Sequence, residues 1–298
     1  MSPESEPIYD FIIGLYHACN GNWKELQRHS GVTDDELRWF LEYAAQFLGN
    51  CGNYKSFGDS KFIPRARPEV FEAVAATSAE TKHLFERTKV GGGLYATKDP
   101  ALMHFGYPGH MSTYYPDSPG ITKEEITHVG EFLDKKRLLP ENTRLRKTEK
   151  GDFEVLIASG VKSPPADARD LGEETRWELD GPLKGKTVCL IFGDHVEEMA
   201  KIALNIKKAE QEAANEIQRK MHEEYAKSFG TGSMKAYKQS QRFWIQDKGP
   251  MVESDIGFVE TYRDPHGVRG EWEGFGAYLV LLFEPTLMPP ATRVLSLC

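Results

Sequence analysis

One stretch of the sequence, Arg242 to Phe275, combines residue types that could bind or transform a ligand. It reads RFWIQDKGPMVESDIGFVETYRDPHGVRGEWEGF. Its carboxylates are Asp247, Glu253, Asp255, Glu260, Asp264, Glu271 and Glu273, and its aromatic residues are Phe243, Trp244, Phe258, Tyr262, Trp272 and Phe275. Loops of this composition on short strands often hold sites, because glycine lets the backbone approach a ligand while carboxylates supply charge. The alternative is a glycine-bounded β-segment whose acids are solvated.

The alternation from Met251 to Val259 predicts a strand that places Glu253 and Asp255 on one face. Two carboxylates side by side repel each other unless a cation lies between them, so the pair could receive an ammonium group or an arginine side chain. The alternative is an internal salt bridge to a basic residue of the same run: Arg242, Lys248 or Arg263.

A metal site on a helix is not indicated. A zinc peptidase needs two histidines on one helix face with a glutamate beside the first, as in His-Glu-x-x-His. The only His-Glu pair is His222-Glu223, and Ala226 and Lys227 occupy the positions where a second histidine would stand. We therefore expect His222 to lie on a helix surface and expect no metal ligand.

Other hydrolase motifs are also missing from the sequence. It contains neither the G-x-S-x-G motif of serine hydrolases nor the P-loop of nucleotide hydrolases, and Cys51, a conceivable nucleophile, has no identifiable histidine partner.

The composition is typical of a soluble globular protein. The 298 residues are 40% hydrophobic and 28% charged, with a formal net charge of −8. This acidic balance argues against nucleic acid or an anionic membrane as a partner, and it suits a cationic or neutral substrate. No apolar run approaches the roughly 20 residues of a transmembrane helix. The four cysteines form no C-x-x-C pair, so we expect a cytoplasmic protein without a disulfide framework.

Hydrophobic periodicity predicts the elements that position the run. Helical spacing covers residues 7–18, 33–48, 68–86, 122–138 and, as one long helix ended by Gly230, 194–229. Alternating, branched residues predict strands at 144–148, 153–158, 176–179 and 186–192, the first two as a hairpin. Capping boxes at Thr33 and Thr122 support two of the helices. Helices come first and strands mix in later, so the predicted class is α+β.

Three blocks of the sequence resemble the dipeptidyl peptidase III family. RFWIQDKGPMVES followed by IGFVETYRDPHGVRGEWEGF looks like that family's signature. GNYKSFGDSKFIP at Gly52 to Pro64 is similar to a second family block, and NTRL at Asn142 to Leu145 to a third. The blocks occur in the family's order, and the resemblance covers about Ile8 to Phe275.

Members of that family are cytosolic zinc aminopeptidases that remove dipeptides from the N-termini of short peptides, and they have two lobes around a wide cleft. The resemblance implies that this chain is most of the lower lobe, a mostly helical α+β fold with a small β-barrel that could be incomplete here. The family's zinc motif, a helical His-Glu-x-x-x-His with a downstream glutamate, does not occur in these 298 residues. The resemblance thus implies zinc in full-length members and no cofactor on this chain.

Site residues follow from matching positions. Glu253 matches the glutamate that receives the free N-terminal ammonium of a peptide, and Phe57 is expected to line the substrate cleft. Asp255 stands where the family has a tyrosine whose hydroxyl helps stabilise the oxyanion. An ionised aspartate cannot donate a hydrogen bond, and loss of one such donor costs about two to three orders of magnitude in rate. We therefore expect no catalytic residue on this chain, and short peptides with a free N-terminus as its partners.

The resemblance also implies that the chain consists of two segments, one inside and one outside the family. Residues 1–276 are expected to form the partial lower lobe, and residues 277–298 to be a tail outside the family, since AYLVLLFEPTLMPPATRVLSLC matches nothing in it. Our hypothesis for the tail is a different reading frame or a retained intron on a truncated chain. The alternatives to a catalytically inactive homologue are a non-catalytic peptide-binding or regulatory fragment and an unstable product of truncation.

Overall fold

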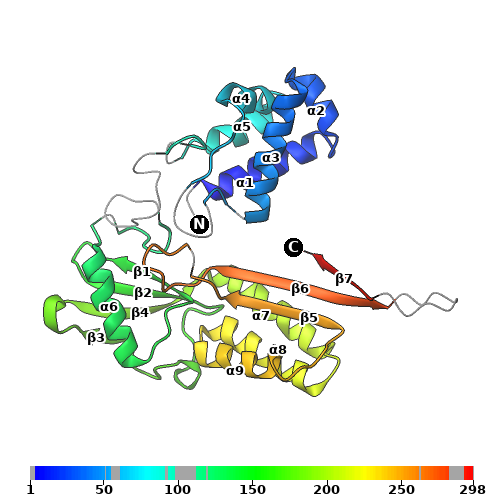
Figure 1. The fold of residues 1–298 in the computed structure, drawn as a ribbon. Helices are drawn as coiled ribbons and strands as arrows, with labels where there is room; N and C mark the ends of the chain where they lie inside the picture. Colours follow the sequence, from blue (N-terminus) through cyan, green and yellow to red (C-terminus); the bar gives the residue numbers. More distant parts are fainter. Residues whose placement is uncertain are drawn as a thin grey trace. The chain divides into compact units, whose positions relative to one another are not determined.

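The computed structural model describes residues 4–50, 52–54, 61–90, 93–97, 112–118, 120–261, 263–281 and 292–297 (Figure 1). The chain divides into two compact units. Unit 1 comprises Met1–Tyr115 and Tyr262–Gly267, and unit 2 comprises Pro116–Thr261 and Val268–Cys298. Each unit has its own cluster of buried apolar side chains.

Unit 1 consists of helices packed around aromatic side chains. The helices are α1 (Ser5–Ala18), α2 (Trp23–Ser30), α3 (Asp34–Asn50), α4 (Pro68–Ala75) and α5 (Ala79–Arg87). Phe11, Phe40 and Phe71 are fully buried. The rings of Phe40 and Phe71 meet edge to face with centroids 5.2 Å apart, an arrangement that aromatic pairs favour.

Periodicity predicts most of these helices. α1 and α3 confirm the helices expected at 7–18 and 33–48. The single helix expected at 68–86 is wrong: it is two helices, because Ser78 adopts an extended conformation and caps α5 by accepting a hydrogen bond from Thr81 N at 3.0 Å. α2 was not predicted, since it is only eight residues long and mostly polar, with Leu26 as its one buried residue.

A buried ion pair ties the start of α1 to the chain beyond α3. Glu4 Oε1 lies 3.0 Å from Lys61 Nζ, and each side chain is only 1% exposed. Lys61 Nζ also donates to Gly93 O at 2.8 Å, and Tyr54 OH donates to Glu4 Oε1 at 3.3 Å. Buried charges are tolerated when they are paired and hydrogen-bonded, so these contacts hold Lys61 in place.

A four-stranded sheet forms the first half of unit 2. Its strands are β1 (Thr143–Lys147), β2 (Phe153–Ala158), β3 (Arg176–Glu178) and β4 (Thr187–Asp194), in the order β1-β2-β4-β3. β1 and β2 form the predicted antiparallel hairpin, whereas β2 and β4 run parallel. A parallel pair needs a long connection, which here contains β3 and the 3₁₀ turns η2 (Ala166–Ala168) and η3 (Gly181–Leu183). The helix α6 (Lys123–Lys136) precedes the sheet and begins at the predicted capping box of Thr122.

Three helices follow: α7 (Val196–Gln211), α8 (Glu216–Thr231) and α9 (Met234–Trp244). The single long helix predicted from Asp194 to Phe229 is therefore wrong. The chain turns after Gln211, and the Asn215 side chain caps α8 by accepting a hydrogen bond from Gln218 N. Asparagine favours this position because its side chain can hydrogen-bond to the backbone at a helix start, whereas within a helix it competes with the helical hydrogen bonds. Gly232, rather than Gly230, ends α8 in the left-handed conformation with φ of 80°.

An antiparallel three-stranded sheet completes unit 2, with α8 and α9 beside its first strand (Figure 1). Its strands are β5 (Val252–Phe258), β6 (Trp272–Leu281) and β7 (Thr292–Leu297), in the order β5-β6-β7. The predicted α+β class is confirmed. Among the described strands, both sheets are open rather than closed into a barrel, because β5 and β7 are each paired only with β6. The segment boundary at residue 276 falls within β6 and stays a prediction.

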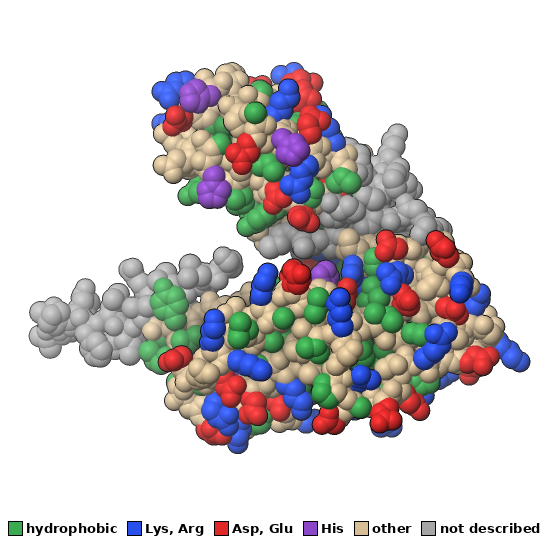
Figure 2. All heavy atoms as spheres, turned by 180° about the vertical axis from the view of Figure 1, so that it is seen from behind, with side chains coloured by type: hydrophobic (Ala, Val, Ile, Leu, Met, Phe, Trp, Pro, Cys, Tyr) green, Lys and Arg blue, Asp and Glu red, His purple; other side chains and the backbone are tan. Residues whose placement is uncertain are grey.

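The surface of unit 2 mixes charges of both signs. On the face shown in Figure 2, lysine and arginine side chains are interspersed with aspartate and glutamate. Arg219 illustrates the pattern, since it lies within 3.2 Å of carboxylate oxygens of Glu210, Glu216 and Glu223. On this face, charges of opposite sign therefore partly offset each other. No helix among the described residues is long and apolar enough to cross a membrane.

Candidate functional site

β5 carries two carboxylates side by side. This strand confirms the one predicted for residues 251–259, and its ladder with β6 pairs Glu253 with Ala277 and Asp255 with Phe275. Because side chains alternate along a strand, these four residues share one face of the sheet. Both carboxylate side chains are partly exposed, so a ligand in solvent can reach them.

An indole fixes the position of Glu253. Trp244, the last residue of α9, donates its Nε1–H to Glu253 Oε1 at 2.5 Å. The Trp244 ring packs against a buried cluster on α7 and α8: Ala203, Met221, Tyr225 and Phe229. That packing sets the direction of the indole N–H, and a hydrogen bond to an ionised acceptor is stronger than a neutral one. The carboxylate is therefore oriented before any ligand arrives.

Asp255 contacts side chains of the two neighbouring helices. Tyr225 of α8 donates its hydroxyl to Asp255 Oδ1 at 3.0 Å, and Gln241 of α9 donates to the Tyr225 oxygen at 2.8 Å. Gln241 Nε2 is also 3.4 Å from Asp255 Oδ1. Burial, followed by the charge of Asp255, raises the pKa of Tyr225 well above its usual range, so the hydroxyl keeps its proton. Tyr225 is fully buried and cannot offer this hydroxyl to a ligand.

Neither carboxylate has a basic partner in the part of the chain that the structure describes. No lysine or arginine nitrogen of those residues lies within 4.0 Å of Glu253 or Asp255. Arg242 donates instead to Gln239 Oε1 at 3.1 Å. The alternative of an internal salt bridge therefore has no support among these residues.

Phe57 lies outside the described residues, so its expected position in a cleft stays a prediction. The residues that bracket its segment are described: Tyr54 and Lys61 form an isolated antiparallel bridge.

His222 is not the surface residue that the sequence predicts. Its side chain is only 9% exposed, and burial lowers its pKa, although a hydrogen bond to the backbone of Ala209, near the end of α7, acts in the opposite direction. The prediction was wrong because it was made from the missing metal spacing, which carries no information about how helices pack. In the structure the chain folds back after α7, so that α8 packs against α7 and buries this face.

The residues that the structure describes do not fit a zinc ion. The described residues contain no group of three or more histidine, cysteine, aspartate or glutamate side chains that could hold a metal. Glu223, which follows His222, lies 3.2 Å from Arg219, and Ala226 offers no ligand atom. The sequence as a whole lacks His-Glu-x-x-x-His, so we assign no metal-dependent step to it.

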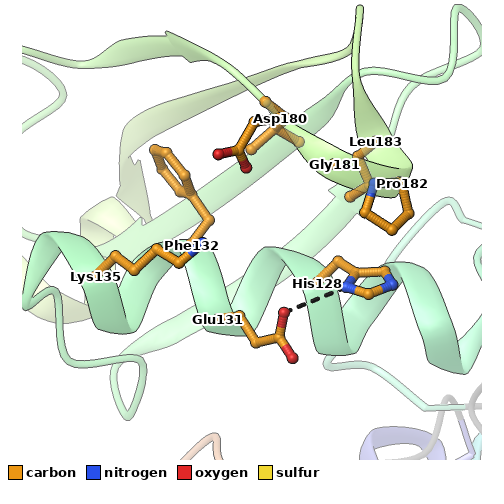
Figure 3. Close-up of a pocket in the computed structure, with 9 residues that line it drawn as sticks. His128, Glu131, Phe132, Lys135, Asp180, Gly181, Pro182 and Leu183 are labelled. Carbon is orange, nitrogen blue, oxygen red and sulfur yellow. Dashed lines mark hydrogen bonds and ion pairs between the residues drawn. The ribbon is translucent and has the colours of Figure 1, made fainter.

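A separate cavity of about 230 Å³ lies between α6 and η3 of unit 2 (Figure 3). On its α6 wall, His128 Nδ1 and Glu131 Oε2 are 3.3 Å apart, and Lys135 and Asp180 add one charge of each sign. Because its lining carries groups of both signs, some of them in contact with each other, we assign this cavity no ligand. Neither Glu253 nor Asp255 lines it.

Three residues of the candidate site were not predicted from the sequence: Tyr225, Gln241 and Trp244. Trp244 belongs to the dense run, which drew attention to it without giving it a role. The contacts of all three depend on how α8 and α9 pack beside β5, and periodicity carries no signal for that packing.

The sequence of this chain is similar to those of known peptidases. The model of peptidase family M49 matches residues 87–280. Dipeptidyl peptidase 3 from Dictyostelium discoideum is 40% identical over 275 residues, which are 92% of this chain and 37% of that protein. Dipeptidyl peptidase 3 from Homo sapiens is 38% identical over 289 residues, 93% of this chain and 38% of that protein. The chain thus spans somewhat more than a third of the length of these relatives.

Solved structures of the same kind were also found. The structure of DPP III from Caldithrix abyssi covers 94% of this chain, and the match spans 40% of that chain with a TM-score of 0.44 and 14% identity.

Proposed function

Because this chain belongs to peptidase family M49, we propose that it binds the free N-terminus of short peptides through Glu253 and does not itself hydrolyse them. One observation carries the proposal. Glu253 is held by Trp244 on an accessible strand face, with no basic partner among the described residues. A carboxylate that is fixed in direction and lacks an internal counter-charge is suited to receive an external ammonium group.

The N-terminal ammonium of a peptide is a compact cation with three hydrogen-bond donors. It can pair with Glu253 while the nearby charge of Asp255 adds to the attraction. Hydrogen bonds to charged groups contribute about 1.5–3 kcal/mol, so this contact would account for roughly a tenfold to hundredfold preference for a free over a blocked N-terminus.

Hydrolysis is not part of the proposal. M49 enzymes are zinc metallopeptidases, and in such enzymes zinc activates a water molecule and polarises the scissile carbonyl. The sequence lacks the family's zinc motif, and the described part of the chain contains no ligand set for the metal. Asp255, at the position of the family's tyrosine, accepts hydrogen bonds from α8 and α9 and cannot donate one to an oxyanion. We propose that Asp255 has two other roles: it connects β5 to α8 and α9 through these hydrogen bonds, and it adds negative charge to the site.

We further propose that residues 1–276 are part of the family's lower, substrate-binding lobe and that residues 277–298 are a segment outside the family. We also propose that the protein is cytoplasmic. Two free cysteines, Cys19 and Cys189, are consistent with the reducing compartment that this location implies.

Calorimetric titration tests the binding half of the proposal. The chain is titrated with a tetrapeptide that has a free N-terminus and with its N-acetylated twin, and only the free peptide should bind measurably. Equal binding of the twins would refute an ammonium site.

Elemental analysis and an activity assay test the catalytic half. We expect no stoichiometric zinc in the purified chain and no dipeptide release from a chromogenic dipeptide amide. Bound zinc together with chelator-sensitive turnover would refute the claim that the chain is inactive.

A further inference from the structure

Phe275 is a half-exposed aromatic residue on the sheet face that carries both carboxylates. Its side chain is 50% exposed, and it lies directly opposite Asp255 in the ladder between β5 and β6. Glu253 pairs with Ala277, two residues further along β6, so Glu253 is the diagonal neighbour of Phe275. Diagonal neighbours are about 7–8 Å apart, a distance that aromatic and long side chains can span.

The surroundings of Phe275 leave room beside Glu253. Ala277, the β6 residue next to Phe275 on this face, places only a methyl group opposite Glu253. Single exposed apolar residues are ordinary. Phe275 differs from such residues because it adjoins the carboxylate that the proposed function uses.

We propose that Phe275 is a specificity residue, which contacts the side chain of the first residue of a bound peptide and favours an apolar one. The inference rests on the proposed function, since it requires the peptide ammonium to be at Glu253. The ammonium nitrogen and the first Cβ are attached to the same Cα, which places them only about 2.5 Å apart. The first side chain therefore begins beside Glu253 and can extend over the exposed ring.

Contact with the ring removes apolar surface of both partners from water, which favours binding in proportion to the area covered. A peptide that begins with glycine has no side chain to make this contact. Its ammonium group can still pair with Glu253, so the two contributions can be measured separately.

The test compares two peptides, Leu-Ala-Ala-Ala and Gly-Ala-Ala-Ala, by calorimetric titration of the full chain. We expect the wild-type chain to bind the leucine peptide about tenfold more tightly, as for burial of part of one aliphatic side chain. Phe275→Ala should reduce this ratio to within about twofold and leave the affinity for the glycine peptide unchanged. Phe275→Leu, which keeps an apolar surface, should retain a ratio between those two values.

Tyr278→Ala is the matched control. Tyr278 is also an exposed aromatic residue of β6 (42%), but it pairs with Val252 and so lies on the opposite face. This variant should keep the tenfold ratio. An unchanged ratio in Phe275→Ala, or an equal loss in Tyr278→Ala, would overturn the role of Phe275. If N-acetylation of the glycine peptide leaves wild-type binding unchanged, the ammonium site itself fails, and that outcome is distinct from a failure of Phe275.

Discussion

The indole of Trp244 donates a hydrogen bond to Glu253 Oε1 at 2.5 Å and so joins the end of α9 to the strand that carries the two carboxylates. Glu253 is placed by β5, but its carboxylate is directed by a helix packed on the apolar cluster of unit 2. The geometry of the site therefore depends on helix packing as well as on the strand.

Trp244→Phe should weaken peptide binding without unfolding the chain. The substitution keeps most of the ring but removes the N–H that orients Glu253, and a hydrogen bond to a charged group contributes about 1.5–3 kcal/mol. We expect the affinity for a tetrapeptide with a free N-terminus to fall about tenfold or more in a calorimetric titration. Trp177→Phe is the control, because it removes a similar bond, from Trp177 Nε1 to Glu174 Oε2 at 2.9 Å, away from β5. Equal affinities of the two variants would contradict the role of Trp244.

Tyr225→Phe should destabilise unit 2. The change removes the buried hydroxyl that Asp255 accepts at 3.0 Å and leaves only the longer contact from Gln241. We expect the free energy of unfolding to fall by about 1–3 kcal/mol in urea. Tyr237→Phe serves as the control: its ring packs on Gly257 of β5, and no described residue bonds its hydroxyl. A loss that is the same for both tyrosines would show that Asp255 does not depend on Tyr225.

His222 should make the native state sensitive to acid. Burial lowers its pKa from the usual 6.5, so near that pH the native state binds fewer protons than the unfolded state. Stability therefore rises with pH and is lost as the pH falls below about 6.5. His222→Gln should flatten the fall in the free energy of unfolding between about pH 7 and 5. The exposed His29 of α2 provides the control, and a His29→Gln variant with the same flattening would argue against His222.

Lys61→Met should strongly destabilise unit 1. It leaves Glu4 buried without its cation, and removing one partner of a buried ion pair costs about 3–5 kcal/mol. Lys89→Met removes a lysine from an exposed pair with Glu86, whose side chains are 53% and 52% exposed; such pairs contribute at most about 1 kcal/mol. Urea unfolding followed by fluorescence measures both. Similar midpoints for the two variants would mean that the buried pair does not hold Lys61 in place.

The sequence predicted what depends on local pattern. The hairpin of β1 and β2, the strand β5 and the shared face of Glu253 and Asp255 all follow from alternation along the chain. The family also followed from the sequence, because long blocks of it are specific even where their structural role is not evident.

The sequence did not predict the features that depend on how helices and strands pack against one another. Nothing in the periodicity of residues 194–229 marks the turn between α7 and α8, since both helices carry apolar residues at similar spacing. The burial of His222 depends on that turn, and the absence of a metal-binding spacing, from which a surface position was predicted, does not reveal it. The contact between Trp244 and Glu253 joins a helix to a strand across a loop, and no rule of spacing predicts it.

The central claim is that Glu253 receives the ammonium group of a peptide. Its most direct test is a calorimetric titration of the wild-type chain, Glu253→Gln and Glu273→Gln with a free tetrapeptide and its N-acetylated twin. Glu273 is the control, because it lies on the same sheet face and its Oε1 accepts a hydrogen bond from Glu260 N at 3.1 Å. We expect wild type and Glu273→Gln to prefer the free peptide at least about tenfold, and Glu253→Gln to bind the twins equally. A Glu253→Gln variant that keeps the preference would contradict the claim.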